Sequence, residues 1–424
     1  MNRNKQHQSD CGCDQDKSKL LSADDALAYL TGSINAIDES QTVKLDEGLS
    51  RVLSNDMISK INVPGFDNSA MDGYAIYLKE EQINSPQDLV FEVVERIPAG
   101  SVGAELIPGY AAQIFTGAPI PKGANTVIMQ EECELIDGGR KIQISRPLKL
   151  LENIRPVGND IQIGDSVLKK GRQLKAQDIA LLASVGVEEL QVYRKIQVGI
   201  FFTGDEIVYP GEELKPGQIY NSNYYSLTAM LTKLHCNIIS LGNIPDTFDE
   251  TKQALVHLQD RCDLIITTGG VSVGEEDHVK PAVESIGNLD MWRIKIKPGK
   301  PLAYGQVGDA KFIGLPGNPV SAMVTFVMFA IPLIKKMQGL ENFFNKVHKV
   351  QTDFDWYRSK PRREFVRVRL DNTQIPPMAS QYPKQGSDVL SSMVWADGLL
   401  EIPENTTFKK GRVLNFYPLD RILS

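Results

Sequence analysis

Short apolar runs alternate with stretches of helical spacing along residues 196–340. The runs typical of buried strands are QVGIFFTG, NIISLGNI, CDLIITTGG and KFIGLPGN. The helical stretches are NYYSLTAMLTKLHC, DETKQALVHLQD and the apolar residues 320–334. Strands that alternate with helices predict a parallel sheet covered on both faces. Such sheets bind ligands at the carboxyl ends of their strands, where this chain places its glycine-containing loops.

The pattern changes on both sides of this α/β region. Residues 63–150 contain short β-branched runs separated by Pro and Gly, which predicts a compact all-β domain. In REFVRVRL of the C-terminal part, apolar residues alternate with arginines, which predicts a strand. Ser22 is expected to cap a helix, and the helical stretch AQDIALLASVG is expected to end at Gly186. The expected segments are a flexible tail (1–19), two parts of one linker region (20–62 and 151–195), a β domain inserted between them (63–150), the α/β domain (196–340) and a C-terminal β domain (341–424).

Composition narrows the class of protein. A chain of 424 residues is too long for one ordinary core, and its net charge of −7 without a large basic block argues against nucleic-acid binding. Five cysteines without framework-like spacing indicate a reducing compartment, so we expect a cytoplasmic protein. Residues 320–334, interrupted by Pro332, predict a buried helix and no membrane insertion. His7, Cys11 and Cys13 lack a second ligand pair, which favours a plain tail over a metal site.

The stretch ITTGGVSVGEEDHVK, residues 266–280, combines glycines with three acids. Gly269, Gly270 and Gly274 let the backbone approach a ligand closely, and the first amides of a following helix favour an anion. The carboxylates would repel a phosphate, but Mg²⁺ takes oxygen ligands from both carboxylates and phosphates. The loop therefore predicts a phosphate or pyrophosphate ligand with Mg²⁺. The alternative is that residues 275–277 only complement the helix dipole.

Other turns carry related chemistry. FFTGDEI places Glu206 just after a glycine at a second strand end, which favours the Mg²⁺ interpretation. Asn221 and Ser222 lie at a helix start, where an ordinary N-cap is an equal alternative. Asp67 and Asp72 lie in PGFDNSAMDGYA, and acids in such turns usually bond to the backbone.

A basic segment, RIKIKPGKPLAYG, follows the acidic loops. Cations around a Pro-Gly turn suit a phosphate or another oxyanion, although a solvated basic strand is the alternative. The cations are Arg293, Lys295, Lys297 and Lys300. In GLPGNPVSA, Pro316 and Pro319 fix a rigid turn with Ser321 near the next helix start, and this loop has a purely structural alternative.

Taken together, these loops are specific. PGFDNSAMDGYA, TGAPIP, IRPVGNDI, FFTGDEI, TTGGVSVGEEDH, IKPGKP and GLPGNPVSA occur in one chain and in this order. Over residues 20–424 the chain resembles the molybdopterin molybdenumtransferase family, which includes MoeA and the E domain of gephyrin. The resemblance implies an elongated linker domain with an inserted β domain, a parallel-sheet α/β molybdopterin-binding domain and a C-terminal β barrel. It also implies a homodimer whose active site lies between the two subunits.

The resemblance implies a reaction and its residues. Adenylylated molybdopterin and molybdate would be the substrates, Mg²⁺ the cofactor, and molybdenum cofactor and AMP the products. The implied catalytic residues are Asp67, Thr116, Asp160, Glu206 and Asp277. The implied substrate-binding residues are Asn221, Gly269, Gly270, Ser272, Gly274, Arg293, Lys297, Lys300, Pro316, Pro319, Ser321, Arg363 and Ser391 or Ser392. The implied metal ligands are Glu206, Asp246 and Asp277.

Two positions depart from the family pattern. Asp246 is followed by Thr247 where the family often has a second aspartate, and Arg293 stands where many members have lysine. Two alternatives are weaker. A molybdopterin adenylyltransferase, which we expect as an upstream partner, is a single α/β domain without the flanking β regions. A molybdopterin carrier or scaffold would have no need of the full acid set. Molybdoenzyme maturation factors are the expected downstream partners.

Overall fold

The computed structural model describes residues 20–83, 88–271 and 277–423. It divides the chain into two compact units. We call Thr42–Val192 the insert unit, and the remaining residues, which include Tyr193–Ser424, the main unit. Ser272 and Gly274, both expected in the phosphate loop, lie outside the described residues. The segment boundaries expected from the sequence stay predictions.

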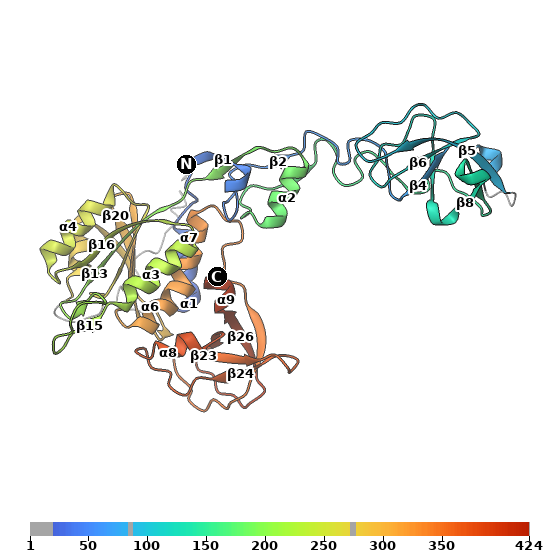
Figure 1. The fold of residues 1–424 in the computed structure, drawn as a ribbon. Helices are drawn as coiled ribbons and strands as arrows, with labels where there is room; N and C mark the ends of the chain where they lie inside the picture. The colour runs from blue at the N-terminus through green and yellow to red at the C-terminus, as the bar shows by residue number, and fades with distance from the viewer. Residues whose placement is uncertain (1–19, 84–87, 272–276, 424) are drawn as a thin grey trace, which may run out of the picture. The chain divides into compact units, whose positions relative to one another are not determined.

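A six-stranded sheet forms the centre of the main unit (Figure 1). Its order is β16 (Asn237–Ile244), β13 (Gln197–Thr203), β17 (Leu264–Thr268), β21 (Ala310–Leu315), β20 (Pro301–Val307) and β18 (Gly287–Arg293). The first four strands are parallel, as the βα rhythm predicts. Strands β20 and β18 extend the sheet in antiparallel fashion, which the sequence pattern did not indicate.

Helices cover both faces of this sheet. Ile266 of β17 belongs to the core cluster beneath one group of helices, whereas its neighbour Ile265 belongs to the cluster beneath the other. Successive strand residues point to opposite faces, so burial on both faces explains the uninterrupted apolar runs. The first group contains α1 (Ala23–Gly32), α3 (Ser222–Lys233), α6 (Pro319–Thr325) and α7 (Ile331–Met337). The second contains α4 (Phe248–Gln259) and α5 (Val279–Ile286). Helix α1 begins after Ser22, whose side chain accepts from the amide of Asp25, as expected of its N-cap.

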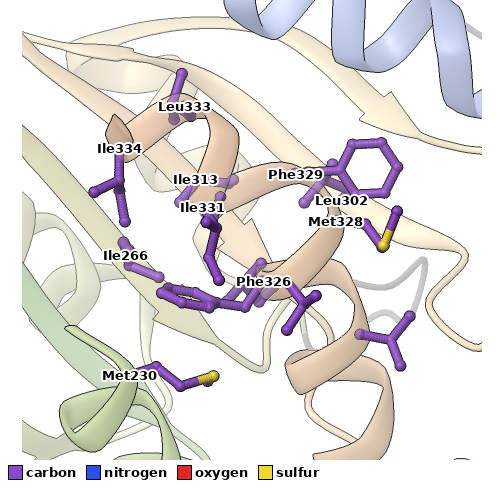
Figure 2. Close-up of a cluster of buried hydrophobic side chains, with 14 of the residues drawn as sticks. Met230, Ile266, Leu302, Ile313, Phe326, Met328, Phe329, Ile331, Leu333 and Ile334 are labelled. Carbon is purple, nitrogen blue, oxygen red and sulfur yellow. The ribbon is translucent and has the colours of Figure 1, made fainter. Parts of the chain in front are cut away.

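Residues 319–337 form one continuous apolar helix with a π-helical segment, Phe326–Ala330, between α6 and α7. Asn345 donates to the carbonyl oxygen of Val327 (2.7 Å) within this segment. In Figure 2, Phe326 lies among Ile266, Met230 and Ile331. The helix is long and apolar enough to cross a membrane, but 83% of its apolar window is buried inside the protein. The expected buried helix is therefore confirmed.

The C-terminal strands close into a barrel. Strand β23 (Arg363–Asp371) pairs with both β24 (Met378–Gln381) and β25 (Gly398–Ile402). Strands β22 (His348–Thr352) and β26 (Val413–Pro418) complete the five-stranded circle. A short strand from the α/β region, β19 (Ile296–Lys297), pairs with the start of β23. Two short helices, α8 (Ser391–Trp395) and α9 (Leu419–Leu423), accompany the barrel strands in this part of the chain. The expected C-terminal β barrel is confirmed, and the basic segment is joined to it directly.

The insert unit contains a second six-stranded sheet, with the order β7, β4, β6, β5, β9 and β8. These strands are β4 (Gly73–Ile76), β5 (Leu89–Ile97), β6 (Tyr110–Ile114), β7 (Thr126–Met129), β8 (Glu134–Ile136) and β9 (Lys141–Ile144). The chain before and after this sheet forms helix α2 (Ala176–Ser184) and short two-stranded pairings. These pairings join β2 (Met57–Ile58) to β11 (Ser166–Leu168), and β3 (Asn68–Ser69) to β10 (Ile154–Arg155). Residues before and after the sheet are thus hydrogen-bonded to each other.

The π-helical segment offers a test of the core. Phe326 is fully buried in the largest cluster, and we expect Phe326→Ala to lower the free energy of unfolding by about 3–5 kcal/mol because it leaves a cavity. The same change at Phe344, which is 56% exposed, should cost no more than about 0.5 kcal/mol. Denaturant unfolding of both variants measures this, and equal losses would contradict the assigned packing.

Candidate active site at the carboxyl edge of the central sheet

Three parallel strands end side by side. Phe202 of β13 pairs with Thr268 of β17, and Thr268 pairs with Leu315 of β21. The loops that follow these strands therefore leave the sheet at the same edge. They carry the FFTGDEI acids, the TTGG glycines and the GLPGNP turn. The strand register thus brings these motifs to one edge of the sheet, as expected.

The two described glycines of the TTGG loop have no room for a side chain. Gly269 and Gly270 have φ of +92° and +59°, which residues with a Cβ atom adopt reluctantly. A Cβ atom on Gly269 would lie 3.0 Å from the carbonyl oxygen of Thr203, and one on Gly270 would lie 2.5 Å from a methyl of Val279. Bare backbone at the strand end suits close approach of an anionic ligand.

Asp277 stands beside this loop, two residues before α5. Both of its carboxylate oxygens are buried, and neither has a hydrogen bond of good geometry within the described part of the chain. The pKa of Asp277 is raised to about 7, mainly by burial; the nearby amides of Lys280 and Val279 oppose this rise, and the charge of Asp246 adds to it. The two amides do not offset burial, so the carboxyl group takes up a proton unless a cation lies beside it.

Of the other expected acids, Asp246 acts on Asp277 through its charge, but the acids do not form a finished metal site. Asp205 accepts a long hydrogen bond from the amide of Asp246 (3.5 Å). Glu206 is exposed, and its carboxylate folds over Gly204, where an added Cβ atom would lie 2.5 Å from Oε2. Among the described residues, no three His, Cys, Asp or Glu side chains are grouped closely enough to hold a metal. The orphaned oxygens of Asp277 nevertheless fit a hard cation that takes its other ligands from phosphate or water.

Asn221 has the structural role that its position allowed. It is the N-cap of α3, and its side chain accepts from the amide of Tyr224 (2.9 Å). Its amide nitrogen donates to Asn243 of β16 (2.6 Å). Both ends of this buried side chain are therefore used within the fold.

The basic segment faces the barrel. Lys297 forms an ion pair with Glu364 of β23 (3.1 Å), which Lys360 also contacts (2.8 Å). Desolvation lowers the pKa of Lys297 despite this partner. Lys300 is exposed and Arg293 is half-buried. The intervening Gly299 packs on α6, where an added Cβ atom would lie 2.6 Å from Thr325.

The turn before α6 lies at the same junction. Pro316 is buried, Pro319 opens the helix, and Ser321 is buried in its first turn. The amide of Val320 donates to the carbonyl oxygen of Ser387, in a loop of the barrel (3.0 Å). The turn thus has a structural role, and it brings Ser321 close to the barrel loop, while its expected role in substrate binding stays a prediction.

Two of the three arginines of β23, Arg363 and Arg367, differ in their surroundings. Arg363 binds both carboxylate oxygens of Asp24 (2.6 and 2.7 Å) and also contacts Glu401 and Glu404 (3.0 and 3.3 Å). The hydrogen bond to Asp24 is the main reason that the pKa of Arg363 is raised. In this arrangement its guanidinium is occupied by carboxylates. Ser391, expected beside it, is exposed on α8.

Arg367 is the residue that our reading of the sequence missed. It is only 1% exposed and donates to Ser392 Oγ (3.0 Å) and to the carbonyl oxygen of Gly386 (2.8 Å). Burial lowers the pKa of Arg367 to about 10, which the charge of Asp388 opposes. A buried guanidinium bonded to neutral groups retains affinity for an anion. The sequence contains no local signal for this burial, because the strand pattern places Arg367 on the polar face with Arg369.

Three loops of the insert unit bring the remaining expected residues together. The carboxylate of Asp67 accepts from the amide of Val157 (2.7 Å), and the amide of Asp160 donates to the carbonyl oxygen of Val63 (2.9 Å). The amide and hydroxyl of Thr116 both donate to Asp72, at 2.8 and 2.9 Å. These bonds lower the pKa of Asp72. The side chains of Asp67, Thr116 and Asp160 are exposed.

Comparison with known families agrees with this architecture. The MoeA N-terminal region (domain I and II) matches residues 21–186, the probable molybdopterin binding domain matches residues 199–336, and the MoeA C-terminal region (domain IV) matches residues 349–419. The chain belongs to the MoeA family. The insert unit thus lies within the MoeA N-terminal region up to residue 186, and the barrel corresponds to domain IV.

Similar proteins cover nearly the whole chain. The molybdopterin molybdenumtransferase of Haemophilus influenzae is 43% identical over 408 residues, which span 95% of this chain and 100% of that protein. The protein of the same name from Nostoc sp. is 35% identical over 341 residues, 79% of this chain and 78% of its own length. A crystal structure of the molybdopterin biosynthesis MoeA protein from Pyrococcus horikoshii has a TM-score of 0.83 at 33% identity, covering 94% of this chain and 100% of that one. The fold is therefore the MoeA multidomain fold.

The raised pKa of Asp277 predicts a pH-dependent stability in the absence of divalent cations. The folded state keeps the proton up to a pH of about 7, whereas the unfolded state loses it near the ordinary value of 3.8. The folded state therefore binds more protons between these values, and stability falls as pH rises through this window. Asp277→Asn cannot ionise. Its stability relative to wild type should rise by about 1 kcal/mol between pH 5 and pH 8, after allowance for solvent screening.

Thermal unfolding in a chelating buffer at the two pH values measures this difference. Asp249→Asn serves as the control, because Asp249 is exposed in the first turn of α4. Its difference from wild type should be the same at both pH values. If the stability difference between Asp277→Asn and wild type were the same at both pH values, Asp277 would not be desolvated.

Proposed function

We propose that the chain is a molybdopterin molybdenumtransferase, which inserts molybdenum from molybdate into adenylylated molybdopterin with release of AMP. The observation that carries the proposal is the pairing of bare glycine backbone with the orphaned carboxylate of Asp277 at one sheet edge. This pairing suits a pyrophosphate with its cation. The full-length similarity to the molybdopterin molybdenumtransferase of Haemophilus influenzae supports a molybdopterin substrate.

The pyrophosphate end would lie over the TTGG loop. Gly269 and Gly270 leave their backbone open to the phosphates. Asp277, whose buried oxygens suit a hard cation, would hold Mg²⁺ together with phosphate or water ligands, because Glu206 and Asp246 are not grouped closely enough with it to complete a site. Bound Mg²⁺ neutralises charge on the bridging phosphates. Asp277 must be ionised for that role, and a cation beside it lowers its pKa.

The molybdate end would lie at the junction of the basic segment, α6 and the barrel. Lys297, Lys300 and Arg293 supply positive charge there, while Pro316 and Pro319 form the wall beside Ser321. We assign the barrel's guanidinium to Arg367 in place of Arg363. Arg367 is buried among neutral groups, whereas three carboxylates occupy Arg363. Ser392, bonded to Arg367, accordingly takes the place of Ser391.

The insert unit supplies further acids. Asp67, Thr116 and Asp160 lie on loops that are hydrogen-bonded into one exposed group with Asp72. In the proposed homodimer, the insert unit of one subunit completes the site on the main unit of the other. The exposed carboxylates would orient the reacting groups and favour the productive geometry.

The proposed reaction implies partner proteins that act before and after it. A molybdopterin adenylyltransferase must supply the substrate, and molybdoenzyme maturation factors consume the product. Cys133, Cys236 and Cys262 are free thiols, which supports a reducing, cytoplasmic setting. A carrier or scaffold with the same fold is the second candidate. It would bind molybdopterin without releasing AMP.

The reaction itself is the first test. We expect AMP release from adenylylated molybdopterin to require both molybdate and Mg²⁺. Asp67→Asn should reduce this release at least about 100-fold, because the lost charge acts in the transition state. Asp88→Asn, on the same unit, should leave the rate unchanged. Tight binding without AMP release would favour the carrier, and full activity of Asp67→Asn would remove Asp67 from the site.

Substituting each arginine in turn distinguishes the proposed role of Arg367 from that of Arg363. Arg367→Gln should raise the KM for molybdate by about 10-fold or more, because a charged hydrogen bond to the oxyanion is lost. Arg363→Gln should instead lower stability, since Asp24, Glu401 and Glu404 lose their shared cation. Steady-state kinetics and thermal unfolding of both variants measure the two effects. The reverse pattern would return the anion-binding role to Arg363.

A further inference from the structure

Asn223 joins two loops of the sheet edge from a third element. It lies in the first turn of α3 and is 8% exposed. Its amide nitrogen donates to the carbonyl oxygen of Gly317 (2.7 Å) and to Thr268 Oγ1 (3.2 Å). Thr268 ends β17 immediately before the glycines, and Gly317 lies in the turn between β21 and α6. One side chain therefore connects positions 45 and 94 residues away in sequence.

The orientation of this amide is fixed by its partner. The carbonyl oxygen of Gly317 can only accept, so it requires the nitrogen of Asn223 on its side. The side-chain oxygen then points away from Gly317. It is buried and has no hydrogen-bond partner among the residues that the structure describes. An unmatched buried acceptor costs about 1–3 kcal/mol, so its retention favours a role beyond stability.

The two connected loops touch each other directly. The amide of Gly269 donates to the carbonyl oxygen of Leu315 (3.2 Å), and a Cβ atom on Gly317 would lie 3.6 Å from the Cα atom of Gly269. Movement of either backbone must therefore displace the other. Asn223 prevents the two loops from separating, because it holds both from the side of α3.

The same turn leads to the proposed molybdate end. Three residues after Gly317, the amide of Val320 donates to Ser387 of the barrel (3.0 Å). The neighbouring Gly386 accepts from Arg367 (2.8 Å). Hydrogen bonds and short chain segments thus run from Asn223 to the glycine loop in one direction and to the buried arginine in the other.

We propose that Asn223 is a positioning residue that sets the spacing between the pyrophosphate-binding loop and the molybdate-binding junction. This inference rests on the proposed function, in which a single substrate must reach both places. Asn223 does not need to touch the reacting atoms. Its effect falls on the alignment of two bound groups, and a misplacement of about 1 Å can reduce a rate about 100-fold.

Two substitutions isolate this effect. Asn223→Ala removes the amide, and Asn223→Asp keeps the size but sets an acceptor against the carbonyl oxygen of Gly317. We expect both to lower kcat for AMP release about 100-fold, while the Kd values for molybdate and for adenylylated molybdopterin, each measured alone, change less than about 3-fold. Thr232→Ala, which removes an intrahelical bond from the same helix, should retain the wild-type kcat.

Hydrogen–deuterium exchange tests the clamp without reference to activity. Residues 315–322 and 267–271 should exchange faster in Asn223→Ala than in wild type, and Thr232→Ala should leave them unchanged. Unchanged exchange, or a wild-type kcat in both Asn223 variants, would overturn the inference. So would a loss of kcat accompanied by equal losses in both affinities, since that is general loosening. A wild-type enzyme that releases no AMP would instead overturn the proposed function.

Discussion

The register of three parallel strands is the constraint on which the candidate site depends. Because Phe202, Thr268 and Leu315 are neighbours across the sheet, the loops that follow them start from one line. That register is held by burial on both faces, since alternate residues of each strand enter different core clusters. A slip would move apolar residues between two filled cores and would also separate the loops. The packing of the core and the geometry of the site therefore have the same origin.

Electrostatic compensation decides which charged residues are structural and which remain available. Glu364, buried in the barrel, is matched by Lys297 and Lys360, and Arg363 is matched by carboxylates from α1 and the barrel. These groups stabilise the junction of α/β domain and barrel. Arg367 is bonded mainly to neutral atoms, and Asp277 has no partner of good geometry among the described residues. These two opposite charges suit a ligand that carries both a cation and an anion.

The sequence predicted those features that depend on local pattern. The parallel strands, their helices and the barrel strand β23 followed from periodicity, and the N-caps at Ser22 and Asn221 from residue type. The antiparallel strands β18 and β20 escaped because polar residues and glycine interrupt their apolar residues, as Asn288 and Asp290 do in β18 and Gly305 and Gln306 do in β20. Arg367 escaped because the simple alternation of β23 gives one polar face, whereas barrel closure and the loop at Gly386 bury that face locally. Such burial depends on contacts between distant segments, which no local window contains.

Asn223 illustrates the same limit and also bears on the choice between an enzyme and a scaffold. The N-cap Asn221 accounts for the helix start, so the sequence pattern does not single out Asn223, two residues later. Yet Asn223 shares with Thr203 and Asp277 a buried polar atom that lacks a partner among the described residues, and all three adjoin the same sheet edge. Each such atom reduces stability. A scaffold could replace them with apolar residues and become more stable, because its contacts lie elsewhere. A chain that keeps unmatched polar atoms where three loops converge is organised around a ligand that will match them, which is the expectation for an enzyme.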